Sequence, residues 1–566
     1  MMNHSTASKP ADQGLLARKA GLPAKDAKLS MAHMYVAFIS LLIGGLMGLL
    51  QVLVRTGKMT LPFGIDYYQV LTVHGVILAL VLTTFFIIGF QYALMSKTVG
   101  MSDGERKWAW ISFYVMLIGT VVTAVMILLG KANVLYTFYA PLQAHPLFYI
   151  GLALVVVGSW IAVFVNLHQF FKWKKQHRGE VSPLLAFMVA INMIIWFIST
   201  LGVAATVVIQ LIPWSLGLVD EINVLVSRTL FWYFGHPLVY FWLLPAYMAW
   251  YAIIPKIIGG KIFSDSLARL AFIMFLLFSI PVGFHHQLLE PGIDPFWKYI
   301  QVVLTFAVAI PSLLTAFSMF ATFESAGRAK GYTGLFGFMR GLPWKDVRFF
   351  APFVGMLAFV PAGAGGLINA SHQLNQVVHN TIWVTGHFHL TLATTVILTF
   401  FGISYWLIPV LTGRKLNAHI NRLGIIQTIV WSIGMFIMSG AMHIAGLLGA
   451  PRRSSYSEYG GSEQAMEWIG YQYAQAIGGS ILFIGILLMV YIFVYMTFFA
   501  PKGQEEFPMA ETAEDALPTP MVFENWKLWI GLAVALILFA YTIPFIDIIQ
   551  NSPPGSPPFK WPIGYN

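Results

Sequence analysis

Five histidines in apolar stretches of the sequence have spacings typical of metal ligands. His387 and His389 are two residues apart, so on an α-helix they point about 200° away from each other and would serve different centres. His285 and His286 are adjacent, differ by about 100° around a helix, and can both lean toward one ion. With His236 they form a three-imidazole site with an open position, and neutral imidazole suits copper, zinc or iron.

A sixth histidine, His74, is free to oppose one member of the 387/389 pair. Two axial imidazoles give a six-coordinate haem that transfers electrons, whereas one axial imidazole leaves an open face for a small ligand. The economical assignment is one haem between His74 and His389, one haem on His387, and one ion on the other three histidines.

The composition places these histidines in a membrane protein. The chain has 566 residues, of which 58% are hydrophobic and only 10% are charged, far less than in a soluble protein. Because it contains no cysteine, disulfides, iron–sulfur clusters and thiolate copper sites are excluded from this chain. Any metal must therefore be held by nitrogen or oxygen. The net charge of +10 is explained by membrane topology, and no nucleic-acid partner is expected.

Apolar runs long enough to cross a bilayer recur throughout the chain and predict an all-α, polytopic bundle of about thirteen transmembrane helices. A polar tail over residues 1–30 lacks the apolar core of a signal peptide. A single bundle over 31–548 and a short outer tail over 549–566 complete the expected organisation. The predicted spans are 31–54, 70–96, 108–129, 146–171, 184–213, 230–255, 269–290, 300–323, 349–368, 381–410, 422–447, 471–499 and 525–548.

The distribution of Lys and Arg predicts a cytoplasmic N-terminus, since that orientation puts roughly 25 basic residues in inner loops and about 8 in outer loops. In this topology the six histidines all fall in the outer third of the membrane, although the topology was assigned without them. A lone histidine in a span is more often a packing residue, as expected for His443, but six at one depth favour a functional site.

At these residues the chain resembles subunit I of the haem–copper oxygen reductases. Gly235-His-Pro-Leu-Val-Tyr240, Gly283-Phe-His-His-Gln287 and Gly386-His-Phe-His-Leu390 match the ligand motifs of that family, and His74 matches its second-helix ligand. The resemblance implies three cofactors: a low-spin haem b, a high-spin haem of a, o or b type, and one copper ion (copper B). Their implied ligands are His74 and His389 for the first, His387 for the second, and His236, His285 and His286 for the third.

The resemblance also implies a covalent bond between His236 and Tyr240, whose phenol would supply an electron and a proton when the O–O bond breaks. The two residues are one helical turn apart, which makes such a link geometrically reasonable. The A-type members of the family carry Glu where this chain has Leu238 and a Lys in the eighth span. Here that span contains no Lys, and no carboxylate lies deep in any span. The chain therefore resembles the B-type branch, whose prokaryotic members use a single hydroxyl-lined proton path.

That path is expected to use Tyr247 and Tyr251, which continue the face of Tyr240 toward the inside. Ser312 and Thr315, three apart on the eighth span, are expected to belong to the same path. Spacing alone allows these to be ordinary packing residues, and the resemblance favours the path.

Several residues at the outer side are expected to contact the haems. The family's paired arginines bind haem propionates, and a guanidinium suits a carboxylate. His379 is expected to meet propionates or an exit water cluster, whereas Asn375 stands where close relatives would carry a carboxylate. The arginines are Arg452 and Arg453, and Tyr136 and Tyr139 are expected to line the cavity.

The implied function is that of a terminal oxidase, either a cytochrome c oxidase or a quinol oxidase. It would reduce O2 to water with protons taken from the inside, and proton pumping is expected from the family. Without cysteine, a dinuclear copper centre must lie on a partner subunit II that accepts electrons from cytochrome c; otherwise quinol donates, with a quinol-related subunit as partner. The expected location is the plasma membrane of a prokaryote, with the spans in contact with lipid.

Two alternatives remain open. A nitric-oxide reductase of the same superfamily would hold non-haem iron on the three histidines and typically lacks a tyrosine at position 240. A transporter of another class would contain histidines and no cofactor.

Overall fold

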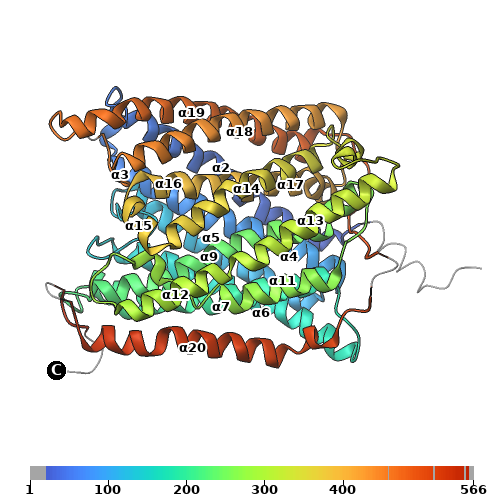
Figure 1. Ribbon diagram of the computed structural model, residues 1–566, viewed down its shortest axis with the longest axis horizontal. Coiled ribbons are helices and arrows are strands. Elements are labelled where there is room, and N and C mark those ends of the chain that lie inside the picture. Colours follow the sequence, from blue (N-terminus) through green and yellow to red (C-terminus); the bar gives the residue numbers. More distant parts are fainter. Residues whose placement is uncertain (1–20, 457, 514–516, 554–555, 560–566) are drawn as a thin grey trace, which may run out of the picture.

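The computed structural model describes residues 21–456, 458–513, 517–553 and 556–559. These residues form helices, with isolated β-bridges as the sole extended pairing among them. Twelve helices in this part of the chain are long and apolar enough to cross a membrane. They run nearly parallel in one bundle, with α18 and α19 along one edge and α20 along the opposite edge (Figure 1).

The first five crossings include the helix that carries His74. They are α2 (Ala24–Val54), α3 (Tyr67–Gly75) continued by a π-helical segment (Val76–Leu82) and α4 (Thr83–Thr98), α5 (Asp103–Leu128), α6 (Pro146–Gln176), and α7 (Leu184–Ala205) continued by a π-helical segment (Thr206–Leu211) and α8 (Ile212–Ser215).

The middle of the chain forms α9 (Val224–Ala252), α10 (Ile254–Ile257), α11 (Asp265–Phe278), a 3₁₀ turn (Phe284–Gln287), α12 (Pro295–Ala307), α13 (Ala309–Ala329) and a second 3₁₀ turn (Gly337–Gly341). The last part forms α14 (Val347–Ala370), α15 (His372–Val378), α16 (Ile382–Phe388), a π-helical segment (His389–Val396), α17 (Ile397–Thr412), α18 (Ala418–Leu447), α19 (Glu463–Val494) with a π-helical end (Tyr495–Phe499), a 3₁₀ turn (Met521–Glu524) and α20 (Trp526–Gln550).

Helix α2 begins at Ala24, which lies inside the predicted polar tail; residues 1–20 of that tail fall outside the described residues. The early start has an electrostatic cause. Asp26 is buried, accepts a hydrogen bond from Ser96 at 2.6 Å, and is paired with Arg106 at 2.5 Å. These contacts tie the inner end of α2 to α4 and α5, so the helix extends beyond its apolar stretch.

The seventh predicted span, 269–290, has no counterpart among the twelve long helices, because its helix ends early. Helix α11 ends at Phe278, and Pro281 follows in the irregular stretch before the 3₁₀ turn. Proline has no N–H and its ring clashes with the preceding helical turn, so an α-helix does not continue through it. The break changes the backbone that carries His285 and His286.

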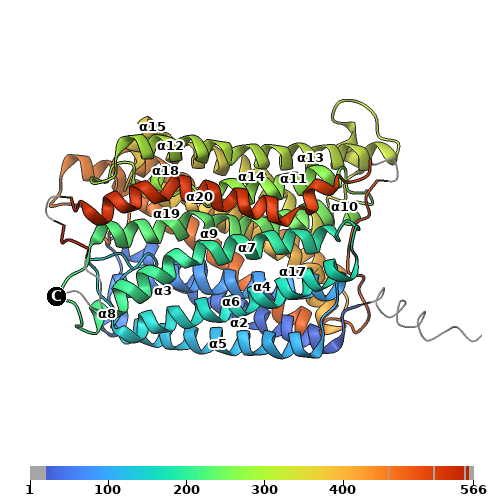
Figure 2. The same cartoon turned by 90° about the horizontal axis from the view of Figure 1, so that it is seen from below.

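Two of the π-helical segments adjoin predicted ligands. One begins two residues after His74, and the other begins at His389 itself. Such local widenings are frequent at functional sites because they rotate the following side chains relative to a regular helix. Helix α20 packs along α11, α12 and α9, and in the view from below it lies across the near face of the bundle (Figure 2).

Candidate metal and haem site

All six predicted histidine ligands line one internal cavity of about 880 Å³. Most of the remaining lining is aliphatic or aromatic, and it comes from helices throughout the chain. The volume lies near the upper end of the range for small-molecule and cofactor pockets, about 300–1,000 Å³. Such a space can hold a large, mainly apolar group that is bound by a few protein ligand atoms. The histidines are His74, His236, His285, His286, His387 and His389.

His74 and His389 face each other across one lobe of this cavity. Their ring planes differ by 12° and their centroids lie 6.1 Å apart. The Nδ1–H of His74 donates to the carbonyl of Gly44 at 2.8 Å, and the Nδ1–H of His389 donates to the carbonyl of Thr385 at 2.8 Å. With Nδ1 protonated, each Nε2 keeps a lone pair for a metal. The gap accommodates an ion with a metal–nitrogen bond of about 2.0–2.1 Å on either side.

Gly48 on α2 provides the space for the His74 ring. A Cβ atom at this position would lie 2.7 Å from Cε1 of His74, closer than van der Waals contact allows. The absence of a side chain therefore lets the helix backbone approach the imidazole directly. The residues of this lobe fit an iron held between two imidazoles.

His236, His285 and His286 form the second candidate centre. One ligand atom from each residue lies within 4.8 Å of the others, and Nδ1 of His236 is 3.2 Å from Nε2 of His286. The Nε2 atom of His236 is buried and has no hydrogen-bond partner among the described residues. Three converging imidazoles without a carboxylate fit copper, zinc or iron, as the donor types predict.

The backbone brings His285 and His286 together by a tighter turn than the predicted α-helix. They lie on the 3₁₀ turn Phe284–Gln287 that follows the break at Pro281. In a 3₁₀ turn successive residues differ by about 120° rather than 100°. Both side chains still reach the same point as His236, so the predicted grouping is present although its helical context was wrong.

Two residues that the sequence did not single out orient this cluster. The Thr305 hydroxyl donates to the carbonyl of Gln301 at 2.6 Å, so its oxygen accepts the Nδ1–H of His285 at 3.1 Å. This leaves the Nε2 lone pair of His285 free for an ion. The indole of Trp232 stacks on the His286 ring at a centroid distance of 3.8 Å and an angle of 5°. Neither contact could be predicted, because the partners come from different helices.

His387 lies on the opposite side of its helix from His389, as their spacing predicts. It faces Gly365 on α14, where a Cβ would lie 2.5 Å from Nδ1 of His387. Between the two histidines, the Phe388 ring packs against Tyr136 and Trp242 at centroid distances of 6.1 and 5.6 Å. The helix thus separates two lobes of the same cavity.

Tyr240 also lines the cavity, with its ring centroid 5.1 Å from that of His236. The four residues expected beyond it pair across two helices. The Tyr247 hydroxyl donates to Ser312 at 3.2 Å, and the Tyr251 hydroxyl donates to Thr315 at 3.0 Å. The structure therefore brings together side chains that are more than sixty residues apart in sequence.

A group of cationic side chains covers the outer end of the cavity. Arg452 and Arg453 line it, and Arg452 donates to Oδ1 of Asn380 at 2.7 Å while its Nε is buried without a partner among the described residues. Burial, followed by repulsion from Arg453, lowers the pKa of Arg452 to about 10. Burial and repulsion from Arg452 lower the pKa of His379 to about 4. The positive charges of Arg452 and Arg453 fit a carboxylate-bearing ligand, to which His379, neutral near pH 7, can donate one N–H.

Arg55 belongs to the same surroundings but was not predicted. It ends α2, lines the cavity, and has a buried Nε without a partner among the described residues. A basic residue at the outer end of a span departs from the positive-inside pattern, and that departure is the signal that could have identified it. Asn375 is buried and donates from Nδ2 to the carbonyl of Asn369 at 2.8 Å.

Comparison with known proteins assigns a family to this arrangement. Residues 28–481 match the family described as "Cytochrome C and Quinol oxidase polypeptide I". The chain belongs to this family. This oxidase subunit is 41% identical over 552 residues to cytochrome c oxidase subunit 1 of Thermus thermophilus, covering 94% of this chain and 96% of that protein. It is 25% identical to quinol oxidase subunit 1 of Sulfolobus acidocaldarius, covering 68% of this chain and 74% of the relative.

The fold of the oxidase subunit matches a solved structure of a haem–copper terminal oxidase dimer with a TM-score of 0.88 and 38% identity, covering 94% of this chain and 95% of that chain. The predicted class, a polytopic helical membrane bundle, is confirmed. The chain is thus a terminal oxidase catalytic subunit in a prokaryotic plasma membrane. Members of the family hold haems and copper B, and generally work with a subunit II and with cytochrome c or quinol as donor.

Proposed function

We propose that this oxidase subunit reduces O2 to water at a centre built from His387 and the His236, His285, His286 cluster. The observation that carries the proposal is the three-imidazole cluster within 4.8 Å, with the Tyr240 ring 5.1 Å from His236. When bound, two haems and one copper ion supply electron transfer and the binding and reduction of O2. The metal content of the purified complex tests this assignment, because it predicts about one copper per two haems.

The ligand roles follow the geometry of the two lobes. His74 and His389 would hold a low-spin haem b, because both present an Nε2 lone pair to the same gap. His387 would hold the high-spin haem, which would supply the binding of O2. His285 and His286, together with His236, would hold copper B. A reduced-minus-oxidised spectrum with extraction of the haems tests both haem assignments.

The high-spin haem is proposed to be of the prenylated a or o type. The cavity continues from the histidines toward the inner side between α13 and α14, where it is lined by Met319, Phe323, Met339 and Phe353. Such an apolar extension fits a long hydrocarbon substituent and is not needed by an unsubstituted b-type macrocycle. The mass of the extracted high-spin haem would show whether the substituent is present.

Tyr240 is proposed to donate a proton and an electron during O–O cleavage, linked covalently to Nε2 of His236. The buried Nε2 without a hydrogen-bond partner supports such a bond. Its formation removes one hydrogen from each ring, and the two electrons pass to O2 during turnover. Peptide mass spectrometry should find residues 236 and 240 cross-linked with the mass of two hydrogens missing.

Protons are proposed to reach Tyr240 from the inside along the pairs Tyr251–Thr315 and Tyr247–Ser312. Hydroxyl groups both accept and donate, so a row of them can pass a proton by reorienting. The branch assignment rests on Leu238, which occupies the place of the A-type glutamate, and on the absence of Lys from the eighth predicted span, residues 300–323. Each proton consumed near the outer side moves charge across the membrane at about 2.3 kcal/mol per 100 mV. Pumping of further protons is proposed from the family.

At the outer end, Arg55, Arg452, Arg453 and His379 are proposed to bind the haem propionates. The partner-free Nε atoms of Arg55 and Arg452 support this role, because a buried N–H group without an acceptor is costly. Replacing Arg452 with Gln should shift the redox potential of the nearer haem, which a spectroelectrochemical titration measures.

Cytochrome c is proposed as the electron donor, with a dinuclear copper centre on a partner subunit II. The support is the 41% identity to a cytochrome c oxidase subunit 1, and the absence of cysteine from this chain places thiolate copper elsewhere. Turnover of the purified complex with reduced cytochrome c and with quinol distinguishes the two donors. Nitric-oxide reduction is the alternative, and Tyr240 argues against it; two-haem protein with extra iron and no copper would favour it.

A further inference from the structure

Helix α20 lies at the margin of the bundle, beyond residues 28–481 that define the family match (Figure 1). Much of it faces outward, including Leu538, Phe539 and Ile543. One short stretch, Ala540 and Tyr541, is instead buried against the chain segment that carries two of the proposed copper ligands. The contacts of this stretch indicate that α20 also holds the neighbouring segment in position.

Gln301 on α12 connects α20 to the backbone immediately before the copper ligands. Its Oε1 accepts hydrogen bonds from the N–H of Gly283 at 2.7 Å and of Phe284 at 2.8 Å. Its Nε2 donates to the carbonyl of Ala540 at 3.1 Å, and the whole side chain is buried. A single amide thus joins the turn of residues 283–287 to α20.

The Ala540 carbonyl is available to Gln301 because of the residue one turn later. In a regular α-helix this carbonyl would accept from the N–H of residue 544. Residue 544 is Pro544, which has no N–H to donate. The proline therefore leaves the buried Ala540 carbonyl without a partner within the helix, and Gln301 donates a hydrogen bond to it.

Tyr541 holds the same turn through packing. Its ring lies 5.4 Å from that of Phe284 and 5.0 Å from that of Tyr233 on α9. A Cβ atom on Gly283 would collide with the Tyr541 hydroxyl, so the turn backbone rests directly on α20. The turn is held by both hydrogen bonds and contact.

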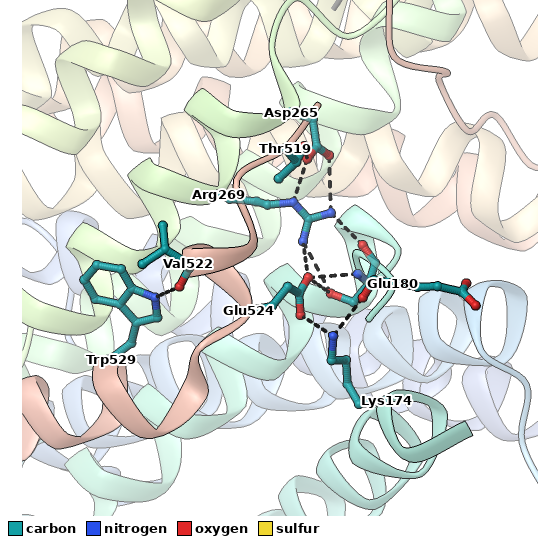
Figure 3. Close-up of polar contacts among 9 residues, drawn as sticks. Lys174, Glu180, Asp265, Arg269, Thr519, Val522, Glu524 and Trp529 are labelled. Carbon is teal, nitrogen blue, oxygen red and sulfur yellow. Dashed lines mark hydrogen bonds and ion pairs between the residues drawn. The ribbon is translucent and has the colours of Figure 1, made fainter. Parts of the chain in front are cut away.

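The inner end of α20 is anchored by a buried ionic cluster (Figure 3). Arg269 on α11 donates to Asp265 at 2.6 Å, to the carbonyl of Ser182 at 2.6 Å, and to Glu524 at 3.2 Å. Glu524 also accepts from the N–H of Ser182 at 2.8 Å and pairs with Lys174 at 2.9 Å. Because Glu524 lies just before α20, the cluster fixes how far the helix can slide along α6, α7 and α11.

We infer that α20 is a positioning element for the copper site, acting through Gln301. The ionic cluster fixes the position of α20 along its axis. At that position Pro544 leaves the Ala540 carbonyl free, and Gln301 joins this carbonyl to the N–H groups of Gly283 and Phe284. His285 and His286 follow directly in the chain. This inference rests on the proposed copper site, and Gln301 and Pro544 are its positioning residues.

The test compares Gln301→Met with Gln427→Met in the purified complex. Gln427 is a matched control, since it is also fully buried and donates to the carbonyl of Gly485 at 3.3 Å, away from the histidines. Gln301→Met should accelerate copper release to a chelator about 10-fold or more, the usual scale for residues that support a metal ligand. The low-spin haem spectrum should be unchanged, and Gln427→Met should release copper at the wild-type rate.

The Pro544→Ala variant distinguishes an effect on the position of the copper ligands from an effect on the stability of α20. Alanine favours the helix and supplies an N–H that competes for the Ala540 carbonyl, so α20 should become more stable to heat while copper release becomes faster. Combined with Gln301→Met it should add nothing further, because both changes break the same connection.

Wild-type release rates in both Gln301→Met and Pro544→Ala would overturn the inference. Wild-type protein that contains no copper would instead refute the proposed function. If Gln301→Met does not assemble, Pro544→Ala alone decides, since it removes no buried hydrogen-bonding side chain.

Discussion

The two centres proposed in this cavity are held in different ways. The rings of His74 and His389 are oriented by helix backbone carbonyls, those of Gly44 and Thr385. The rings of His285 and His286 are oriented by side chains, the Thr305 hydroxyl and the Trp232 indole. The first pair is carried by helices, whereas the second stands on a short turn after a helix break.

This difference implies different sensitivities. A helix carbonyl is held by the surrounding helix, and no substitution of its own residue removes it. A side chain can be removed by one substitution, and it has rotational freedom that must be restrained. We therefore expect the low-spin haem pair to tolerate changes nearby better than the copper cluster does.

The largest effect is expected from removing a copper ligand. His285→Asn should lower copper to below about one tenth of the wild-type content, because two imidazoles bind far less tightly than three. The low-spin haem spectrum should stay unchanged if the centres are held independently. Metal analysis and optical spectra measure both, with His443→Gln as a control that should lose neither metal nor haem. Loss of the low-spin haem in His285→Asn would contradict the separation of the two centres.

Tyr240→Phe should reduce O2 turnover by about 10²–10⁴-fold, the range for removal of a proton donor. Haem and copper content should be normal, since the phenol is not expected to ligate a metal. Oxygen consumption measures this, and Tyr92→Phe, in a helix away from the cavity, should retain activity. Unchanged turnover in Tyr240→Phe at normal metal content would show that the phenol has no catalytic role.

Thr305→Val should weaken copper binding by about 10–100-fold, as is usual for residues that orient a metal ligand. Valine keeps the shape of threonine but cannot accept the Nδ1–H of His285. Chelator competition measures the affinity, and Thr428→Val is the matched control, because the Thr428 hydroxyl donates to the carbonyl of Gly424 and has no other partner among the described residues. Equal copper affinity in the two variants would contradict the conclusion that a side chain orients the copper ligands.

Gly48→Ala probes the backbone-held centre. The added methyl group lies 2.7 Å from Cε1 of His74, so the ring must shift, at a cost of about 1–3 kcal/mol typical of overpacking. The low-spin haem band and its midpoint potential should move while copper content stays constant. Gly440→Ala, which has open space around it, is the control. A change in copper content without a shift of the low-spin haem band would contradict the assignment of Gly48 to the haem centre.

The smallest effect concerns the anchor of α20. Burial raises the pKa of Glu524, but hydrogen bonds from Lys174 and Ser182 outweigh it, so its pKa lies below the usual value. Its stabilising charge is therefore present above about pH 4.3, the unfolded value, and is lost as the pH falls through the lower folded value. Glu524→Gln should cost about 1 kcal/mol between pH 5 and 7, with the difference disappearing in more acidic buffer. Thermal unfolding across this pH range measures it, and a constant difference at all pH values would contradict the charge-based anchor.

The predicted grouping of histidines depended on little more than spacing and depth. The pattern around His387 and His389 already indicated two centres, because a helix turns by a known angle per residue. Spacing together with the family resemblance predicted that Tyr247 and Ser312 belong to one path, but the hydrogen bond between them was not predicted. The predicted helical context of His285 was wrong, because Pro281 interrupts the helix within this apolar run.

What the sequence by itself determined is the membrane fold, its orientation and the ligand types, because hydrophobic run length, basic-residue asymmetry and helical spacing are local properties of the chain. Only the tertiary structure decided which side chains support the ligands. Thr305 and Gln301 act through partners outside their own helix, Arg55 reaches the cavity from the end of α2, and the free carbonyl of Ala540 matters only because α12 lies beside it. Such contacts depend on how helices pack across large sequence separations, which no local pattern records.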